Sequence, residues 1–316
     1  MASPPPTTKS PWLFTFLKVG LSIAAISGVA LTVDLAAAWQ RIVNQNFWLL
    51  AAAAMIMALQ IAIGGLRWHF ILIGLGAQPQ PAASIRIFYL SAFFNTWLWG
   101  TVGGDMLRAW LTHRARFGLA AAVNSVILDR VAAVAGVAIL VLATAPLFVQ
   151  HTKQYVLTLI FVGVAVAGLL CILVATQIQR LPVNWQRHQI LQGAHALSTA
   201  AKQIFLHPTT AFPVLGLAVA AQTVSAIATY VMSVGLNTEL RLIDCIVLMQ
   251  PVALITALPI SVGGWGIRET AMIGILSLVG ISTSAALSLS VQIGLLTILV
   301  TLPGAALWLF QKDTKL

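Results

Sequence analysis

The feature that most constrains the fold is a series of long apolar stretches, with few or no charged residues, that recur along the chain. A bilayer core requires about 20 consecutive apolar residues in helical form, and such stretches lie at about 19–33, 47–66, 119–148, 155–176, 211–234 and 285–310. Only 8% of the residues are charged and 59% are hydrophobic, which excludes an ordinary soluble domain. The sequence therefore predicts an all-α, polytopic membrane protein with about six full transmembrane helices, all within a single transmembrane domain over residues 1–316.

Two further apolar segments are each interrupted by a glycine pair. The first covers 84–99, breaks over 100–104 and resumes at Asp105; the second covers 245–258, breaks over 259–264 and resumes at Trp265. Non-helical backbone at membrane depth must be buried in protein or line a wet cavity, because lipid offers its polar groups no hydrogen-bond partner. We interpret both segments as re-entrant helical hairpins.

The two breaks repeat one another at an offset of 160 residues, which relates Gly103 to Gly263, Gly104 to Gly264, and Arg108 to Arg268. Neighbouring spans align at the same offset, since 47–74 falls on 207–234. Each half, about 12–150 and about 154–311, then has three crossings and one hairpin. An odd number of crossings makes the second half enter from the opposite side, so we predict an inverted-topology repeat.

The distribution of basic residues predicts the orientation, since cytoplasmic loops are enriched in Lys and Arg. With both termini cytoplasmic, 12 basic residues fall inside and four outside, with Arg130 left in the membrane. The inner set is Lys9, Lys18, Arg67, Arg86, Arg108, Arg114, Arg116, Arg180, Arg187, Lys202, Lys312 and Lys315, and the outer set is Arg41, Lys153, Arg241 and Arg268. We expect a multi-pass protein of the plasma (inner) membrane.

The longest polar connection, about 181–206, contains apolar residues at helical spacing. Ile190, Ala194, Leu197, Ala201 and Ile204 recur every three or four positions. The pattern predicts either an amphipathic helix on the inner leaflet or a plain connector helix packed on the bundle.

Two adjacent charged residues, Asp129 and Arg130, lie about ten residues into a span, or about 15 Å at 1.5 Å per residue. They cannot pair well with each other, because adjacent helical positions point about 100° apart. We expect each to find a partner elsewhere, with the charged groups of the hairpins as candidates. The alternative is a purely structural brace between span and hairpin.

The glycine pairs allow a more specific hypothesis. A helix that restarts at Gly104 or Gly264 offers free N–H groups and the positive end of its dipole to a phosphate or carboxylate. Arg108 and Arg268 follow one turn later and could bind the same anion. The alternative is that the glycines only permit tight turns and that Arg108 belongs to the cytoplasmic basic set.

The remaining candidate residues are the two acids of the hairpins. Asp105 and Glu269 could neutralise the arginines, cap the restarted helices, or titrate, and Glu269 is the better candidate for proton coupling. The candidate substrate-binding set is Gly103, Gly104, Asp105, Arg108, Asp129, Arg130, Gly263, Gly264, Arg268 and Glu269.

No motif for catalysis or for a cofactor is found. The sequence contains no metal-ligand spacing, no nucleophile elbow and no nucleotide-binding loop, so we expect neither an enzyme nor a bound cofactor. The net charge of +10 does not indicate a nucleic-acid partner, because the basic residues are spread through apolar sequence.

Taken together, the motifs resemble those of the lysylphosphatidylglycerol synthase transmembrane region, or flippase-like, family. The matching residues are Arg67-Trp68, Phe93-Phe94-Asn95, Gly103-Gly104-Asp105, Arg108, Asp129-Arg130, Leu258-Pro259-Ile260-Ser261, Gly263-Gly264, Gly266 and Arg268-Glu269. Trp99 stands where the first hairpin usually has a proline, and Ala133 where a second acid often follows the Asp-Arg pair.

The resemblance implies translocation of an anionic phospholipid or a lipid-linked headgroup, without aminoacylation, because no synthase domain follows the last span. Without a nucleotide site, transport would run downhill or on an ion gradient. The alternatives are an integral membrane enzyme or an accessory subunit acting on a lipid or lipid-linked sugar, with a lipid-modifying enzyme as partner, and a structural protein whose hairpins merely pack.

Overall fold

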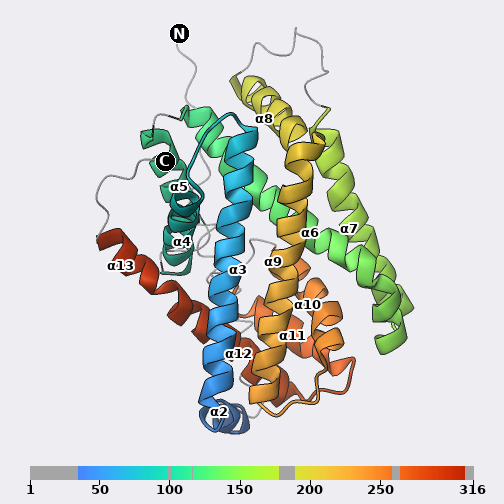
Figure 1. Ribbon diagram of the computed structural model, residues 1–316. Helices are drawn as coiled ribbons and strands as arrows, with labels where there is room; N and C mark the ends of the chain where they lie inside the picture. Colours follow the sequence, from blue (N-terminus) through green and yellow to red (C-terminus); the bar gives the residue numbers. More distant parts are fainter. Residues whose placement is uncertain (1–34, 98–101, 116, 178–188, 258–263, 310–316) are drawn as a thin grey trace, which may run out of the picture.

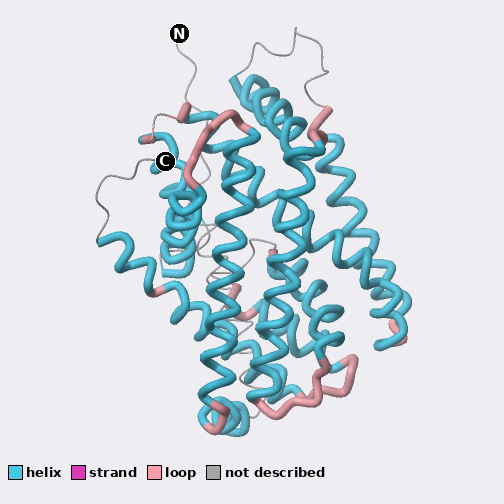
Figure 2. The backbone as a smooth tube through the Cα atoms, viewed as in Figure 1, coloured by secondary structure: helices cyan, strands magenta, loops and turns pink. Residues whose placement is uncertain are grey.

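The computed structural model describes residues 35–97, 102–115, 117–177, 189–257 and 264–309, and over these ranges the chain is helical without strands (Figures 1 and 2). The helices are α2 (Leu35–Val43), α3 (Phe47–Gly74), α4 (Pro81–Trp97), α5 (Val102–Arg114), α6 (Leu119–Thr152), α7 (Tyr155–Ala175), α8 (Gln189–Phe205), α9 (Pro208–Gly235), α10 (Leu242–Thr256), α11 (Ile267–Ser277), α12 (Thr283–Thr301) and α13 (Pro303–Leu309).

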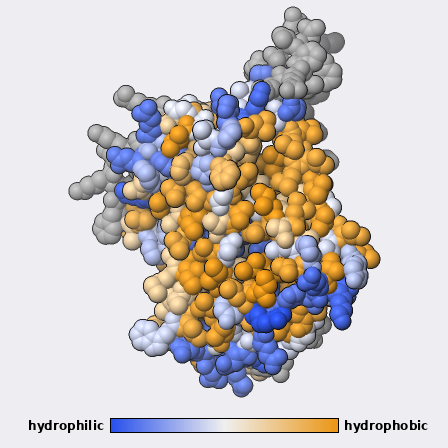
Figure 3. All heavy atoms as spheres, turned by 45° about the vertical axis from the view of Figure 1, so that its right-hand side comes forward, coloured by the Kyte–Doolittle hydropathy of each residue, from blue (hydrophilic) through white to orange (hydrophobic). Residues whose placement is uncertain are grey.

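Five apolar segments are long enough to cross a membrane: α3, α6, α7, α9, and α12 with α13. They correspond to five of the six predicted spans, whereas the sixth, at 19–33, lies outside the described residues. The face in Figure 3 carries a broad hydrophobic surface with hydrophilic residues gathered toward its ends. The prediction of an all-α, polytopic membrane protein is confirmed.

Helices α3 and α9 lie side by side through the centre of the molecule and run in opposite directions (Figure 1). Each has 28 residues. The Asn46 side chain caps α3 by accepting the N–H of Trp48 at 2.9 Å, while α9 begins with Pro208, a residue suited to the first helical position.

The two interrupted segments are helix-break-helix hairpins, α4–α5 and α10–α11, and they lie toward opposite ends of the molecule (Figure 1). Their second helices do not begin where the sequence predicted. Helix α5 begins at Val102, before Asp105, and α11 begins at Ile267, after Trp265. The later start has a physical cause, because Gly264 and Gly266 have φ values of +82° and +87°, outside right-handed helical geometry.

The end of the second span differs from prediction. The sequence placed the end of this span at about 66 and counted Arg67 among the cytoplasmic basic residues, but α3 continues to Gly74, and Arg67 and Trp68 are buried, with exposed fractions of 5% and 0%. The interior supplies a partner for each polar group: Asp129 for Arg67, and the Ser125 hydroxyl for the Trp68 indole N–H at 3.2 Å. A paired arginine can therefore lie inside the helix bundle.

Helix α8 packs on the protein. Ala201 and Ile204 are buried in a cluster with Ile71, Leu128 and Val214. The helix bundle covers at least this part of the apolar face, which favours the packed connector over a helix lying on the leaflet.

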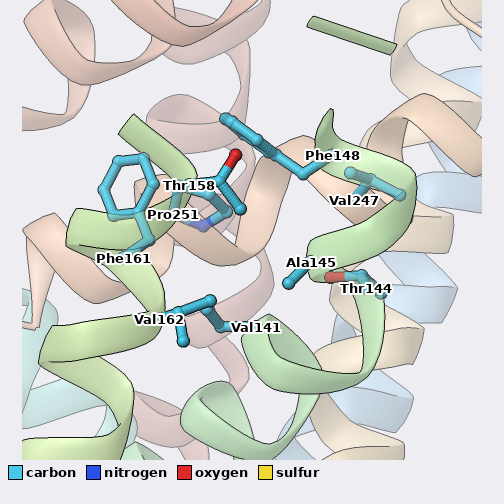
Figure 4. A pocket seen from close by; sticks show the side chains of 9 residues that line it. All are labelled: Val141, Thr144, Ala145, Phe148, Thr158, Phe161, Val162, Val247 and Pro251. Atoms are coloured by element: carbon cyan, nitrogen blue, oxygen red, sulfur yellow. The ribbon is translucent and has the colours of Figure 1, made fainter. Parts of the chain in front are cut away.

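The core between α6, α7 and α10 is tightly packed. Figure 4 shows a small apolar pocket there of about 10 Å³, room for about one water molecule at most. Its two hydroxyls, of Thr144 and Thr158, already donate to the carbonyls of Leu140 and Gln154 at 2.7 Å. Because this pocket has room for no more than about one water molecule, we look for the functional site elsewhere.

Candidate functional site

A cavity of about 460 Å³ lies between the first hairpin, the second hairpin and the helices α3, α6 and α12. Small-molecule sites typically occupy about 300–1,000 Å³. Six charged residues line it: Arg67, Asp105, Arg108, Asp129, Arg130 and Arg268. All but Arg67 belong to the predicted set, so residues from both halves of the sequence meet at one cavity.

The centre of the cluster is Asp129, whose two carboxylate oxygens bind two different arginines. Its Oδ1 accepts from Nε of Arg67 on α3, and its Oδ2 accepts from Nη1 of Arg108 on α5, both at 2.8 Å. All three side chains are at most 6% exposed. One carboxylate thus connects α6 to a transmembrane helix and to a hairpin.

Arg108 lies among aromatic rings as well as acids. Its guanidinium carbon is 5.2 Å from the ring centroid of Trp68 and 5.0 Å from that of Phe88. Contacts of this length are favourable cation–π interactions. The Nε of Arg108 is nevertheless buried with no hydrogen-bond partner among the described residues. Arg108 is therefore an interior residue of the bundle and not a solvated loop residue.

Asp105 binds Arg130, the neighbour of Asp129. Its Oδ2 accepts from Arg130 Nε at 2.8 Å, and its Oδ1 lies 3.5 Å from Arg108 Nη2. Arg130 is more open, with 49% of its side chain exposed. The expectation that Asp129 and Arg130 find separate partners, including hairpin residues, is confirmed.

Gly104 does not offer a free N–H group to an anion. Its N–H donates to Asn95 Oδ1 at 2.9 Å, and Asn95 Nδ2 donates to Asp105 at 3.3 Å. A Cβ at this position would collide with the Ser91 carbonyl on α4. Gly104 therefore permits close packing of α5 on α4, and Gly103 precedes it in the same first turn. The hypothesis of an N-terminal anion site at this glycine is wrong.

In the second hairpin, Arg268 binds Glu269, the next residue. Nη2 of Arg268 is 2.7 Å from Oε1 of Glu269, and its Nε also donates to Ser290 Oγ on α12 at 3.1 Å. Glu269 caps the helix by accepting the N–H of Gly266, as one of its proposed roles requires. The guanidinium of Arg268 lies 4.7 Å from the ring centroid of Trp265.

The glycine pair of the second hairpin does not begin a helix. Gly264 lies in the turn before α11, where its carbonyl accepts the N–H of Arg268 at 3.0 Å, and Gly266 is the N-cap. Gly263 lies outside the described residues. The hypothesis that a helix restarts at Gly264 is therefore wrong, although Arg268 still lines the cavity.

Sequence reasoning missed two site residues. Arg67 could have been found from the apolar residues that continue beyond it, 70–73, which place it inside a span and not at its end. Gly294 on α12 carries no such signal. A Cβ there would lie 2.5 Å from Arg268 Nη2 and 2.7 Å from Trp265 Cη2, so this glycine leaves the space that these two side chains occupy.

A second polar hollow, of about 530 Å³, lies where α6 ends and α10 begins. There Asp244 binds His151 Nδ1 at 2.8 Å and Arg241 Nε at 3.1 Å. Burial alone would raise the pKa of Asp244, but hydrogen bonds from Arg241 and His151 outweigh it and lower the pKa below its ordinary value. The hydrogen bond to Asp244 and the charge of its carboxylate raise the pKa of Arg241.

Neither hollow resembles a metal centre. Among the residues that the structure describes, no group of three or more His, Cys, Asp and Glu side chains could hold a metal ion. The chemistry that the main cavity can perform with these side chains is recognition of an anion by guanidinium groups.

A comparison with known protein families finds a match over almost the whole chain. The model of the lysylphosphatidylglycerol synthase transmembrane region matches residues 15–304. No curated protein matches the chain.

Proposed function

The chain belongs to the family of lysylphosphatidylglycerol synthase transmembrane regions, and from this premise we propose that it is a flippase-like transporter. It moves an anionic phospholipid or lipid-linked headgroup between leaflets and is not itself an enzyme. Membership in the family supports a membrane protein of lipid modification or transport, and the cavity adds the reason for choosing transport.

One observation carries the proposal: Arg108 of the first hairpin and Arg268 of the second line the same cavity. Arginine binds phosphate through paired N–H donors, and such bonds are strong where water is excluded. A charged headgroup cannot cross hydrocarbon unaided, since even one charge at the bilayer centre is costly. A polar cavity inside the bundle gives the headgroup a path, while its acyl or prenyl tails stay in the bilayer.

We further propose that the two halves form an inverted-topology repeat. Helices α3 and α9 have equal lengths and opposite directions, and the hairpins lie toward opposite ends (Figure 1). Transporters of this type bind substrate where the repeats meet and open to each side in turn. This arrangement would let each hairpin admit the headgroup from one leaflet, downhill or coupled to an ion gradient.

The proposed location is the inner membrane, with both termini in the cytoplasm. Arg67, Arg108 and Arg268 line the cavity and do not lie in loops, so they drop out of the charge comparison. Ten predicted inner basic residues then remain against three outer ones. The bias that supports the orientation therefore persists, and Arg268 no longer contradicts it.

A leaflet-sidedness assay in proteoliposomes tests the transport proposal. Fluorescent phosphatidylglycerol is incorporated in both leaflets, and dithionite then reports how fast inner-leaflet label reaches the outer surface. We expect Arg268→Ala to slow translocation at least about tenfold, because one anion-binding side chain is lost. Lys202→Ala is the matched control, since Lys202 is exposed on α8 and does not line the cavity.

Equal translocation rates in the parent, Arg268→Ala and empty vesicles would contradict the proposal. Turnover of the headgroup by the purified protein in detergent, where no second leaflet exists, would instead favour the alternative of an integral membrane enzyme.

A further inference from the structure

The charges around the cavity do not balance. Arg67, Arg108, Arg130 and Arg268 line it, whereas the acids that line it or bind these arginines are Asp105, Asp129 and Glu269. Four guanidinium groups therefore face three carboxylates among the described residues.

The surplus belongs to the first half of the sequence. Arg268 and Glu269 form a pair of their own, as do Arg130 and Asp105, which leaves the buried Arg67 and Arg108 with the single carboxylate of Asp129. Arg67 and Arg108 both depend on Asp129, and both are buried. A buried charge without a full counter-charge is costly, so a site of this kind favours an incoming anion.

A second observation points to the same place. The Nε of Arg108 has no hydrogen-bond partner among the described residues, and the side chain is only 2% exposed. A buried donor that lacks an acceptor carries a full desolvation cost. An anion in the cavity would supply the missing charge, and an oxygen of it that reached Arg108 Nε would supply the acceptor.

Resting on the transport function proposed above, we propose that the cavity accepts a ligand with a single negative charge, a phosphodiester headgroup. The Asp105–Arg130 pair determines the preferred charge of the ligand. Any net charge on this pair adds to the one surplus positive charge of the Arg67–Asp129–Arg108 group. A diphosphate or a doubly ionised phosphate monoester exceeds the available charge. A headgroup without charge leaves the surplus uncompensated.

Asp105 and Arg130 also make the proposal testable, because they are the more open members of the cluster, with side chains 19% and 49% exposed. Asp105→Asn raises the surplus by one positive charge, and Arg130→Gln removes it. The double variant restores the original balance with neither charge present. Asp105→Asn keeps nearly the same shape, and Arg130→Gln keeps a polar side chain of shorter reach.

The experiment measures binding of lipids with identical tails to the full chain in detergent micelles. Tail-labelled phosphatidylglycerol is displaced by unlabelled phosphatidylglycerol, by diacylglycerol, or by phosphatidic acid at pH 8.5, where a phosphate monoester carries close to two charges. In the parent, phosphatidylglycerol should displace the label at least about tenfold better than diacylglycerol and no worse than phosphatidic acid.

The variants should shift this order in opposite directions. Asp105→Asn should prefer phosphatidic acid over phosphatidylglycerol by about tenfold. Arg130→Gln should bind phosphatidylglycerol and diacylglycerol within about threefold of each other. The double variant should return to the parent's order. The same order in all four proteins would overturn the proposal. If Asp105→Asn fails to fold, Arg130→Gln alone still decides, since it predicts loss of the preference for a charged lipid.

Soluble glycerophosphoglycerol distinguishes a lipid from a free phosphodiester. We expect it to compete at least about a hundredfold more weakly than phosphatidylglycerol, since it lacks the apolar tails. Equal competition would overturn the assignment to a lipid. Because binding in micelles needs no second leaflet, failure of the charge rule and failure of translocation are separate results.

Discussion

The two hairpins hold equivalent arginines in different ways. Arg108 of the first hairpin binds Asp129 on α6, shares it with Arg67 on α3, and is 2% exposed. Arg268 of the second hairpin binds Glu269, its own neighbour, and is 15% exposed. The first arginine connects three elements of the bundle, whereas the carboxylate that holds the second lies in the same hairpin.

This difference suggests a division of roles. Moving Arg108 would break ion pairs that connect elements, and breaking a buried pair is strongly destabilising. Turning Arg268 toward a ligand would break its contacts with Glu269 and with the Ser290 hydroxyl on α12, but would leave the Asp129 ion pairs that connect α3, α5 and α6 intact. We therefore expect the first hairpin to matter most for stability and the second for transport.

The largest expected effect concerns the shared carboxylate. Asp129→Asn leaves Arg67 and Arg108 without their counter-charge and should lower the free energy of unfolding by about 3–5 kcal/mol. Glu269→Gln should cost less, about 1–3 kcal/mol, since the amide oxygen can still accept the N–H of Gly266 and the amide NH2 can donate to the Ser290 hydroxyl. Thermal unfolding in detergent, followed by circular dichroism, measures both. A larger loss from Glu269→Gln would reverse the comparison.

Gly104→Ala tests the packing of the first hairpin. Its Cβ would meet the Ser91 carbonyl, part of a backbone that cannot turn away, so the variant should be destabilised by about 1–3 kcal/mol. Gly163→Ala on α7 is the control, because nothing lies within 4 Å of a Cβ there. Equal unfolding midpoints for the two variants would show that α4 and α5 are not in the close contact described.

Gly294→Ala tests the second hairpin through transport. The new methyl group would displace Arg268 and Trp265, so translocation should fall about tenfold while the unfolding free energy changes by less than about 1 kcal/mol. Gly274→Ala on α11, with open space around its Cβ, should keep the parent's rate. If Gly294→Ala translocates lipid at the parent's rate, the position of Arg268 does not matter for transport.

The smallest effect is a dependence of stability on pH at the start of α10. The pKa of Asp244 is lowered in the folded protein, so its contribution is present above the unfolded pKa of about 3.9 and is lost as pH falls through the folded value. We expect a loss below about 1 kcal/mol as pH falls below about 4, because Arg241 is mostly exposed and screened. Asp244→Asn should reduce this dependence; an unchanged profile would assign it to other carboxylates.

Periodicity and charge placement predicted much of the fold. Apolar length identified the five described spans, and the impossibility of pairing Asp129 with Arg130 led to the correct conclusion that each binds elsewhere. These inferences succeed because a long apolar helix needs an apolar environment and because burying a charge without a partner costs free energy.

The errors concern features that only tertiary contacts decide. Arg67 was counted among the cytoplasmic basic residues because it follows the charge-free stretch 47–66, yet it pairs with Asp129 in the interior of the bundle. Gly104 was read as a helix start with free N–H groups, but Asn95, nine positions earlier, accepts its N–H. Gly294 becomes meaningful only beside Arg268 and Trp265, which belong to another element.

The most direct test of the central claim, that both hairpins form one cavity for an anionic lipid headgroup, is native mass spectrometry of the purified protein. The parent and Lys202→Ala should each retain about one phosphate-containing lipid per chain, and Arg268→Ala should lose most of it, because the lipid depends on that guanidinium. Retention of the same lipid by Arg268→Ala at the parent's level would contradict the claim, as would retention of uncharged lipid alone by the parent.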